Sequence, residues 1–366
     1  MKKQILLLTC IIFLMMQAIA KEYTIQITIS GLTGNSTVIL KDFETSTDIN
    51  KGFLVNGKGI LQGELVNGPR LLFLTIINGP STYWCNFMIS NETVSVDASV
   101  KDFPYKVKVS GSTVQDIFYR LNASLADDRI RREVLLERGK AIMADAAKIN
   151  ELKQLVREMF IIDSVEIITK KNFIDKHLQS YPAVLELFLL KSTYDKADLA
   201  ALYFQLSTEL KVSSYGNKIK NFLGIEKIIG KGDKAYAFTA YDTDSIAHSF
   251  PAATGKYILL DFTKDHCVPC MQSVKELQLI HANYAKQLQV ISFSPDEKKG
   301  YEWPLLRDGK GSAGPVIMNY GVDAYPTFVL IDPKGMVVQK WSGYATGGIE
   351  EMLRPYLSRQ REPNQQ

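Results

Sequence analysis

The chain contains little cysteine or histidine, with four of each in 366 residues. Exported proteins that rely on a disulfide framework carry more cysteines, in pairs, and a structural zinc site needs four ligands at regular spacing. Only one close pair of cysteines is present, Cys267 and Cys270. The shortage therefore argues against a disulfide scaffold and a resident metal, and it leaves that pair as the feature to explain.

The chain also lacks a strong charge of either sign. Its formal net charge is +4, and it falls to +2 without the first 20 residues, whose only charged side chains are Lys2 and Lys3. This balance argues against nucleic acid and against an anionic membrane surface as partners. Beyond those residues no apolar run is long enough to cross a bilayer, so we expect no stable membrane insertion.

The N-terminus has the three parts of a secretory signal peptide. A basic pair at positions 2 and 3 precedes the apolar run of residues 5–16, and Ala18-Ile19-Ala20 forms a cleavage site. We predict that residues 1–20 are removed on export. A lipoprotein anchored through Cys10 is the less favoured alternative, because this cysteine lies inside the apolar run.

The rest of the chain is too long for one ordinary domain, and its pattern changes twice. Residues 21–111 alternate apolar and polar side chains between turn signals, which predicts an antiparallel β-sandwich or small barrel. Residues 112–229 are rich in charge and have helical spacing, which predicts a helical connector. Residues 230–366 alternate strand and helix, which predicts an α/β domain with strands at 257–262, 289–294, 327–331 and 336–341. The predicted strands of the first region are 23–29, 37–40, 59–65, 70–77, 85–90 and 93–96.

The cysteine pair stands where the apolar strand 257–262 gives way to a predicted helix. This arrangement suits reversible dithiol chemistry, because the free N–H groups and the dipole at a helix start lower the pKa of the first thiol. The thiol of Cys270, one turn further on, can then resolve a mixed disulfide with Cys267. A static disulfide, or half of a metal site, is the alternative. Cys85 lies in an apolar run, and we predict a buried, inert thiol there.

Residues 230–366 resemble the thioredoxin-like domains of exported thiol-disulfide oxidoreductases of the TlpA/ResA type, which are AhpC/TSA-like. Besides the cysteines, the resemblance is carried by the segments 232–238, 255–262, 320–322, 325–327 and 330–335. The span from Cys270 to Pro326 exceeds that of a minimal thioredoxin, which matches the extra segment of the TlpA type. The resemblance predicts an α/β thioredoxin fold here and assigns no role to the β-domain before it.

The resemblance implies a role for each residue of the predicted site. Cys267 is the nucleophile and Cys270 the resolving thiol, and the two form the catalytic disulfide. Asp261 lies where thioredoxins hold a buried carboxylate below the second cysteine; such a carboxylate has a raised pKa and can take that thiol's proton. Pro326 is expected to be cis, to lie against the cysteines and to shape the substrate groove. The backbone of Tyr325, just before it, is expected to pair with substrates.

Two positions depart from the family pattern. Thr263 and His266 stand where the family usually has tryptophans. A protonated His266 beside Cys267 would stabilise the thiolate and make the pair more oxidising; a solvated His266 with no such effect is the alternative. We count His266 with Tyr325 among the substrate-binding residues. Because Tyr325 replaces a small or β-branched residue, we also expect a change in the substrates that fit.

The predicted function is that of a periplasmic thiol-disulfide oxidoreductase that reduces protein disulfides through the dithiol of Cys267 and Cys270. The resemblance implies no cofactor, because the cysteines carry the electrons, and it implies a membrane-bound thiol relay as electron donor. Reduction of apocytochromes is one task within this family. The alternative function is that of a non-catalytic secreted protein, in which the β-domain binds a ligand or partner and the thioredoxin-like domain is a scaffold.

Overall fold

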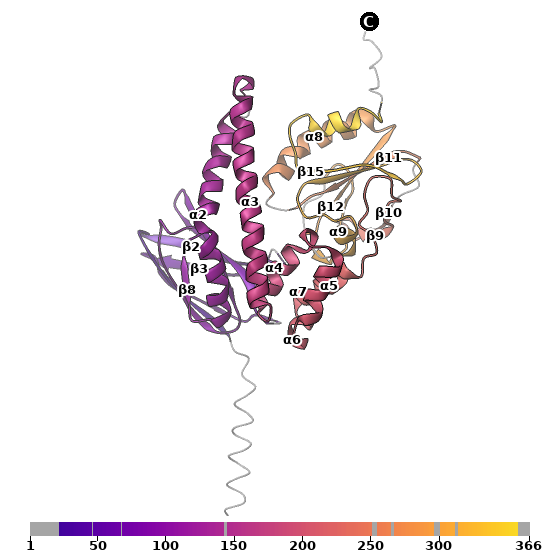
Figure 1. Ribbon diagram of the computed structural model, residues 1–366. Helices are drawn as coiled ribbons and strands as arrows, with labels where there is room; N and C mark the ends of the chain where they lie inside the picture. The colour runs from indigo at the N-terminus through magenta and orange to yellow at the C-terminus, as the bar shows by residue number, and fades with distance from the viewer. Residues whose placement is uncertain are drawn as a thin grey trace, which may run out of the picture. The chain divides into compact units, whose positions relative to one another are not determined.

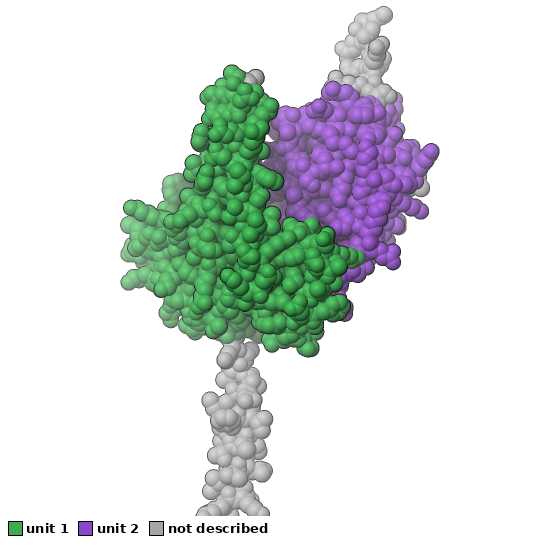
Figure 2. All heavy atoms as spheres, viewed as in Figure 1, with its two compact units in different colours: residues 1–217 green, residues 218–366 purple. Residues whose placement is uncertain are grey.

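The computed structural model describes residues 22–45, 47–66, 68–142, 145–250, 255–264, 267–295, 301–311 and 314–357. The chain divides into two compact units, Met1–Asn217 and Lys218–Gln366 (Figure 2). Each unit has a hydrophobic core of its own. The predicted signal peptide lies outside the described residues. The predicted domain boundaries after residues 111 and 229 stay predictions.

The first unit begins with a single eight-stranded sheet of order β6-β5-β2-β3-β4-β1-β7-β8. The sheet is drawn in indigo and violet in Figure 1, where β2, β3 and β8 are labelled. Its strands are β1 (Tyr23–Ser30), β2 (Asn35–Asp42), β3 (Asp48–Val55), β4 (Lys58–Gly63), β5 (Arg70–Asn78), β6 (Ser81–Ile89), β7 (Thr93–Ser99) and β8 (Lys108–Ser110). Alternate residues of β1, from Tyr23 to Ile29, join one core to which all eight strands contribute. The predicted sandwich or barrel is therefore confirmed as one barrel-like sheet, in which β1 and β7 pair in parallel and the other pairs are antiparallel.

The sequence pattern missed strand β3. Only Leu54 of its eight residues is fully buried, and Asp48, Asn50 and Lys51 disfavour a strand locally. Pairing with β2 along almost its whole length holds β3 in place. The turn from β3 to β4 was predicted, and Gly57 is required there because its φ is +75° and a Cβ atom would lie 2.0 Å from a backbone oxygen.

Helices follow the sheet, so the predicted helical connector is confirmed. They are α2 (Thr113–Ile142), α3 (Ile149–His177), α4 (Tyr181–Leu189), α5 (Lys196–Gln205), α6 (Thr208–Val212) and α7 (Ser214–Leu223). The long helices α2 and α3 form an antiparallel hairpin, in which Leu135 packs near Leu155 at one end and Leu125 near Phe173 at the other. No helix in the part of the chain described here combines the length and apolar character needed to cross a membrane.

Glu166 of α3 joins three helices through ion pairs. Its Oε1 atom lies 2.9 Å from both Arg129 Nη2 of α2 and Lys170 Nζ of α3, and Lys170 Nζ lies 3.2 Å from Glu186 Oε2 of α4. These side chains are at most 19% exposed. Burial alone would raise the pKa of Glu166, but the hydrogen bond from Arg129 and the charge of Lys170 outweigh it and lower this pKa to about 2.

We expect Glu166 to make the first unit sensitive to acid. Because folding lowers the pKa of Glu166 from 4.5 to about 2, its stabilisation is complete above about pH 4.5 and is lost as the pH falls toward 2. Glu166→Gln should cost about 2 kcal/mol of unfolding free energy at neutral pH. The Tm of this variant, measured by circular dichroism, should also fall less steeply between pH 4.5 and pH 2 than the Tm of the unaltered chain.

Glu158→Gln is the matched control for this prediction. Glu158 pairs with Arg131, whose side chain is 62% exposed, and such surface pairs contribute little to stability. An equal effect of the two substitutions on the pH dependence of Tm would contradict the prediction.

The second unit has a five-stranded sheet of order β13-β12-β11-β14-β15. Its elements are β9 (Phe238–Tyr241), β10 (Ala247–Phe250), β11 (Tyr257–Phe262), α8 (Val268–Tyr284), β12 (Leu288–Phe293), β13 (Leu305–Leu306), α9 (Pro315–Asn319), β14 (Thr327–Ile331), β15 (Val337–Ser342) and α10 (Gly348–Leu353). Strands β11, β12 and β13 are parallel, whereas β14 is antiparallel to both of its neighbours. The sequence pattern predicted the four longer strands of this sheet and missed β13 and the separate hairpin of β9 and β10.

Side chains of this sheet alternate between two cores. Leu259 of β11 and Phe328 of β14 pack with α8 and α10 on one face. Leu260 and Phe262 pack with α9 and the β9–β10 hairpin on the other. Helices on both faces of a mixed sheet confirm the predicted α/β thioredoxin fold. Because alternate residues share a face, Asp261 lies with Leu259 on the face that α8 covers.

Candidate active site

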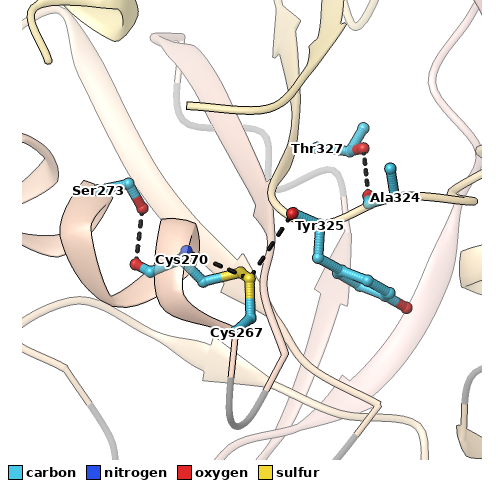
Figure 3. The surroundings of a disulfide bond; sticks show 6 residues. All are labelled: Cys267, Cys270, Ser273, Ala324, Tyr325 and Thr327. Atoms are coloured by element: carbon cyan, nitrogen blue, oxygen red, sulfur yellow. Dashed lines mark hydrogen bonds between the residues drawn. A yellow bond between two sulfur atoms is a disulfide. The ribbon is translucent and has the colours of Figure 1, made fainter. Parts of the chain in front are cut away.

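The two cysteines lie at the start of α8. Cys267 is the N-cap residue, and its Sγ atom accepts a hydrogen bond of 3.2 Å from the backbone N–H of Cys270. Pro269 fits the first turn because the N–H that it lacks has no helical partner there. A disulfide joins the two sulfur atoms, with the Cα atoms 5.2 Å apart (Figure 3).

The two sulfur atoms differ in access. Cys267 is half-buried, whereas Cys270 is 1% exposed. Cys270 shares its side of α8 with Leu277 and Ile280, which pack on the sheet, because the spacing of these residues follows the helical repeat. A large partner can therefore reach the sulfur of Cys267 and not that of Cys270.

The turn before β14 faces the disulfide. The peptide bond between Tyr325 and Pro326 is cis, and Pro326 is buried. The carbonyl oxygen of Tyr325 lies 3.6 Å from Cys267 Sγ, and the tyrosine ring turns away from the sulfur atoms (Figure 3). Since a disulfide sulfur carries no hydrogen, this approach is a contact in the oxidised form, and a protonated Cys267 thiol can donate a hydrogen bond there. Thr327 Oγ1 donates to the carbonyl oxygen of Ala324 at 2.7 Å and braces the turn.

Asp261 is 2% exposed and belongs to a buried hydrogen-bond chain. Ser292 Oγ, on the neighbouring strand β12, donates to Asp261 Oδ2 at 2.7 Å and accepts from Trp303 Nε1 at 2.9 Å. Sequence reasoning missed Ser292 and Trp303. The parallel pairing of Asp261 with Ser292 identifies the serine once the strand register is known. Asp261 lies on the face of the sheet that α8 covers, and Cys270 lies on the buried side of α8.

Three further positions were singled out in the sequence: Thr263, His266 and Tyr325. Thr263 is buried, and its N–H donates to the carbonyl oxygen of Phe293 at 3.0 Å, which continues the edge of β11. His266 lies outside the described residues, so its effect on the thiolate stays a prediction. Tyr325 is half-buried and packs against the core on the α9 face.

The third cysteine of the described chain belongs to the other unit. Cys85 lies on β6 inside the barrel-like sheet, is 2% exposed, and has a pKa raised to about 12 by burial. A thiol that is neither accessible nor ionised at neutral pH does not exchange with disulfides. The predicted burial of Cys85 is confirmed, and the inertness of its thiol stays a prediction.

Comparison with known proteins matches the second unit. Residues 231–340 fit the model of the AhpC/TSA family. Thiol-disulfide oxidoreductase ResA of Bacillus thuringiensis subsp. konkukian is 30% identical over 139 residues, which are 35% of this chain and 77% of that protein. Thioredoxin-like protein YneN of Bacillus subtilis is 29% identical over 122 residues, which are 30% of this chain and 69% of that protein. The crystal structure of a thioredoxin domain from a Bacteroides vulgatus thiol-disulfide oxidoreductase is 23% identical, covers 34% of this chain and 98% of that one, and has a TM-score of 0.30.

The sheet order and the helices on both faces define a thioredoxin-like protein. The chain belongs to the thioredoxin-like thiol-disulfide oxidoreductases of the ResA type, as the match to ResA shows. It is therefore an oxidoreductase, and a barrel-like sheet and a set of helices precede its family domain.

Proposed function

We propose that the second unit reduces disulfides of other proteins through Cys267 and Cys270. The observation that carries this proposal is the sulfur pair at the start of α8, whose accessible member faces the carbonyl of Tyr325. The helix start favours the thiolate of Cys267 over its thiol. Burial protects Cys270 from substrates and keeps it within reach of its partner.

The reaction begins from the reduced pair. The Cys267 thiolate attacks one sulfur of the substrate disulfide, an S–S bond forms between them, and the other substrate sulfur leaves as a thiolate that takes a proton. Cys270 loses its proton and attacks Cys267 Sγ. The mixed disulfide then breaks, the second substrate sulfur leaves, and two electrons have passed from the dithiol to the substrate.

We assign the proton of Cys270 to Asp261. The carboxyl lies on the face of the sheet that α8 covers, and the hydrogen bond from Ser292 holds one of its oxygens in a fixed direction. A carboxylate that is shielded from water and positioned under a thiol serves as a general base. Asp261 thus acts in the second step of the reaction and not in the first.

We assign Tyr325, Pro326 and His266 to contact with the substrate. A peptide bonded to Cys267 must pass the turn before β14, and the outward carbonyl of Tyr325 offers it a hydrogen-bond acceptor. Pro326 has no N–H group to compete for that peptide, and its ring restricts the approach of metal ions to the thiolates.

We further propose that the chain works in the periplasm after removal of residues 1–20. The basic pair, the apolar run and the Ala18-Ile19-Ala20 sequence support export. In that compartment a membrane-bound thiol relay is the electron donor that returns the pair to its reduced form.

The first experiment measures the redox equilibrium of the mature chain with glutathione, read by thiol trapping of Cys267 and Cys270. We expect the pair to cycle with a potential near or below roughly −200 mV, which suits a reductase. A potential well above that value would make the protein an oxidase or isomerase. A pair that does not cycle would contradict catalysis, and the scaffold alternative would then hold.

A further inference from the structure

A groove in the first unit has no part in the function proposed so far. It runs along the outer face of the barrel-like sheet, between strands β5 and β6 on one side and helices α2, α3 and α4 on the other. Its volume is about 520 Å³. Sites for ligands in proteins commonly span about 300–1,000 Å³, so the groove is large enough to hold a ligand.

The sheet side of the groove is lined by four aromatic side chains, Phe43, Phe73, Trp84 and Tyr105, which we call the aromatic row. Neighbouring ring centroids in the row are 5.8, 6.1 and 5.8 Å apart. Trp84 is 36% exposed and the other three rings are half-buried. Large aromatic side chains that meet water in one continuous strip mark a surface for apolar groups.

The helix side of the groove carries both apolar side chains and charged groups, and the charged groups are neutral overall. The apolar side chains are those of Phe118, Ile167, Leu185, Leu189 and Leu190. The three cations and three carboxylates of this side pair with one another: Arg129 with Glu166, Arg132 with Asp163, and Lys170 with Glu166 and Glu186. Both oxygens of Asp163 lie close to the guanidinium of Arg132, at 2.6 and 3.2 Å. Both oxygens of Glu166 accept from Arg129. We call this side the ion-pair wall.

The aromatic row and the ion-pair wall together determine which class of ligand the groove can bind. A charged ligand must compete with partners that already lie within hydrogen-bond distance, and it gains little. A sugar depends on hydrogen bonds to its hydroxyl groups, yet the carboxylates of the wall are already paired with Arg129, Arg132 and Lys170. A lipid chain would bury the ion pairs against hydrocarbon, which is costly. An uncharged polypeptide segment fits both sides, with apolar side chains on the aromatic row and its backbone toward the ion-pair wall.

We infer that the groove binds an apolar, uncharged segment of the unfolded polypeptide whose disulfide reacts at Cys267. The inference rests on the proposed function and adds a second contact with the same substrate. A substrate that is held by one segment presents its disulfide to the dithiol at a raised effective concentration. The groove therefore confers a preference for unfolded polypeptides over small disulfides.

The first test measures binding without any redox chemistry. A fluorescent, cysteine-free peptide that is uncharged and rich in Phe and Leu is titrated with the full chain, and anisotropy is recorded. We expect the double substitution Phe73→Ala, Trp84→Ala to weaken binding by at least about fivefold, since buried aromatic contacts dominate such interfaces. The single substitution Trp84→Phe keeps an aromatic ring and leaves Phe73 unchanged, so this variant should bind the peptide with most of the affinity of the unaltered chain.

Phe53→Ala is the matched control. Phe53 is an aromatic residue of the same sheet, on β3, is 69% exposed and does not line the groove. Its removal should leave peptide binding unchanged. Equal affinities in all variants, or no binding by the unaltered chain, would overturn the inference.

The second test compares two substrates. For an unfolded polypeptide with one disulfide, the Phe73→Ala, Trp84→Ala chain should show a KM raised by about fivefold with kcat retained. With oxidised glutathione, a small disulfide that has no apolar segment for the aromatic row, the same chain should turn over as before. Circular dichroism should show that the first unit, which has a core of its own, is folded in the variant. A matching rise in KM for both substrates would contradict a separate polypeptide site.

Two outcomes separate this inference from the proposed function. If the cysteine pair fails to cycle while peptide binding still depends on Trp84, the reaction scheme is wrong and the groove remains a polypeptide site. If a neutral oligosaccharide binds in place of the peptide and loses affinity in the same double variant, the groove belongs to a sugar and the inference is overturned.

Discussion

Replacing Cys267 by serine is expected to reduce disulfide turnover to the uncatalysed rate, whereas replacing Cys270 by serine is expected to trap the substrate. Serine at position 267 supplies no thiolate, so the first bond cannot form. Serine at position 270 leaves that bond intact and removes the thiol that breaks it. Non-reducing electrophoresis and mass spectrometry should detect a mixed disulfide between Cys267 and a polypeptide substrate only in the second variant.

Cys85→Ala is the control for both cysteine variants. Its thiol is buried and protonated, so its removal should leave turnover within about twofold of the unaltered chain. Full turnover by Cys267→Ser would overturn the mechanism. So would a stable mixed disulfide in which the bonded residue is Cys270, because that sulfur is 1% exposed.

Asp261→Asn is expected to slow the release of product by about a hundredfold at neutral pH, within the range that a general base contributes. The amide keeps the size of the side chain and can still accept the hydrogen bond from Ser292, but it cannot take a proton from Cys270. Rapid mixing with acid quenching should therefore show a long-lived mixed disulfide, formed at the normal rate. The defect should shrink only at a pH well above about 8.5, the pKa of an ordinary thiol, because burial of Cys270 disfavours its thiolate.

Ser292→Ala distinguishes proton transfer from a loss of packing around Asp261. This variant keeps the carboxylate and removes the hydroxyl that donates to it at 2.7 Å. It should slow release by much less than Asp261→Asn, and Tm should fall in both by similar amounts. An unchanged lifetime of the mixed disulfide in Asp261→Asn would remove Asp261 from the reaction.

Much of the fold was readable in the sequence because local patterns dictate it. The alternation from Tyr23 to Ile29 follows the burial of β1, and helical spacing follows the long hairpin of α2 and α3. Strand β3 was missed because its polar residues disfavour a strand locally. The strand forms because it pairs with β2. Its position depends on contacts between segments, which a pattern within one segment does not contain.

The residues of the candidate active site and of the groove divide in the same way, into those that a local sequence pattern reveals and those that only contacts between segments bring together. Cys267 and Cys270 are three positions apart, and Pro326 directly precedes a strand, so short sequence motifs identify all three residues. Ser292 and Trp303 reach Asp261 only through the register of β11 and β12. The aromatic row is harder still, because its members come from separate segments and each one alone resembles an ordinary core residue. The outward direction of Phe73 and Trp84 follows from the register of β5 and β6, whereas Phe43 and Tyr105 lie in turns.

The order of strands in the barrel-like sheet has a consequence for how the chain is made. Strand β1 is the first to leave the ribosome or an export channel, yet both of its partners, β4 and β7, come later in the chain. The parallel pair of β1 and β7 cannot form until residue 99 is free. Until then β1 keeps an unpaired edge that can bind another chain. Residues 22–110 must therefore all emerge before the sheet is complete, and the free edge of β1 depends on protection from aggregation until β7 arrives.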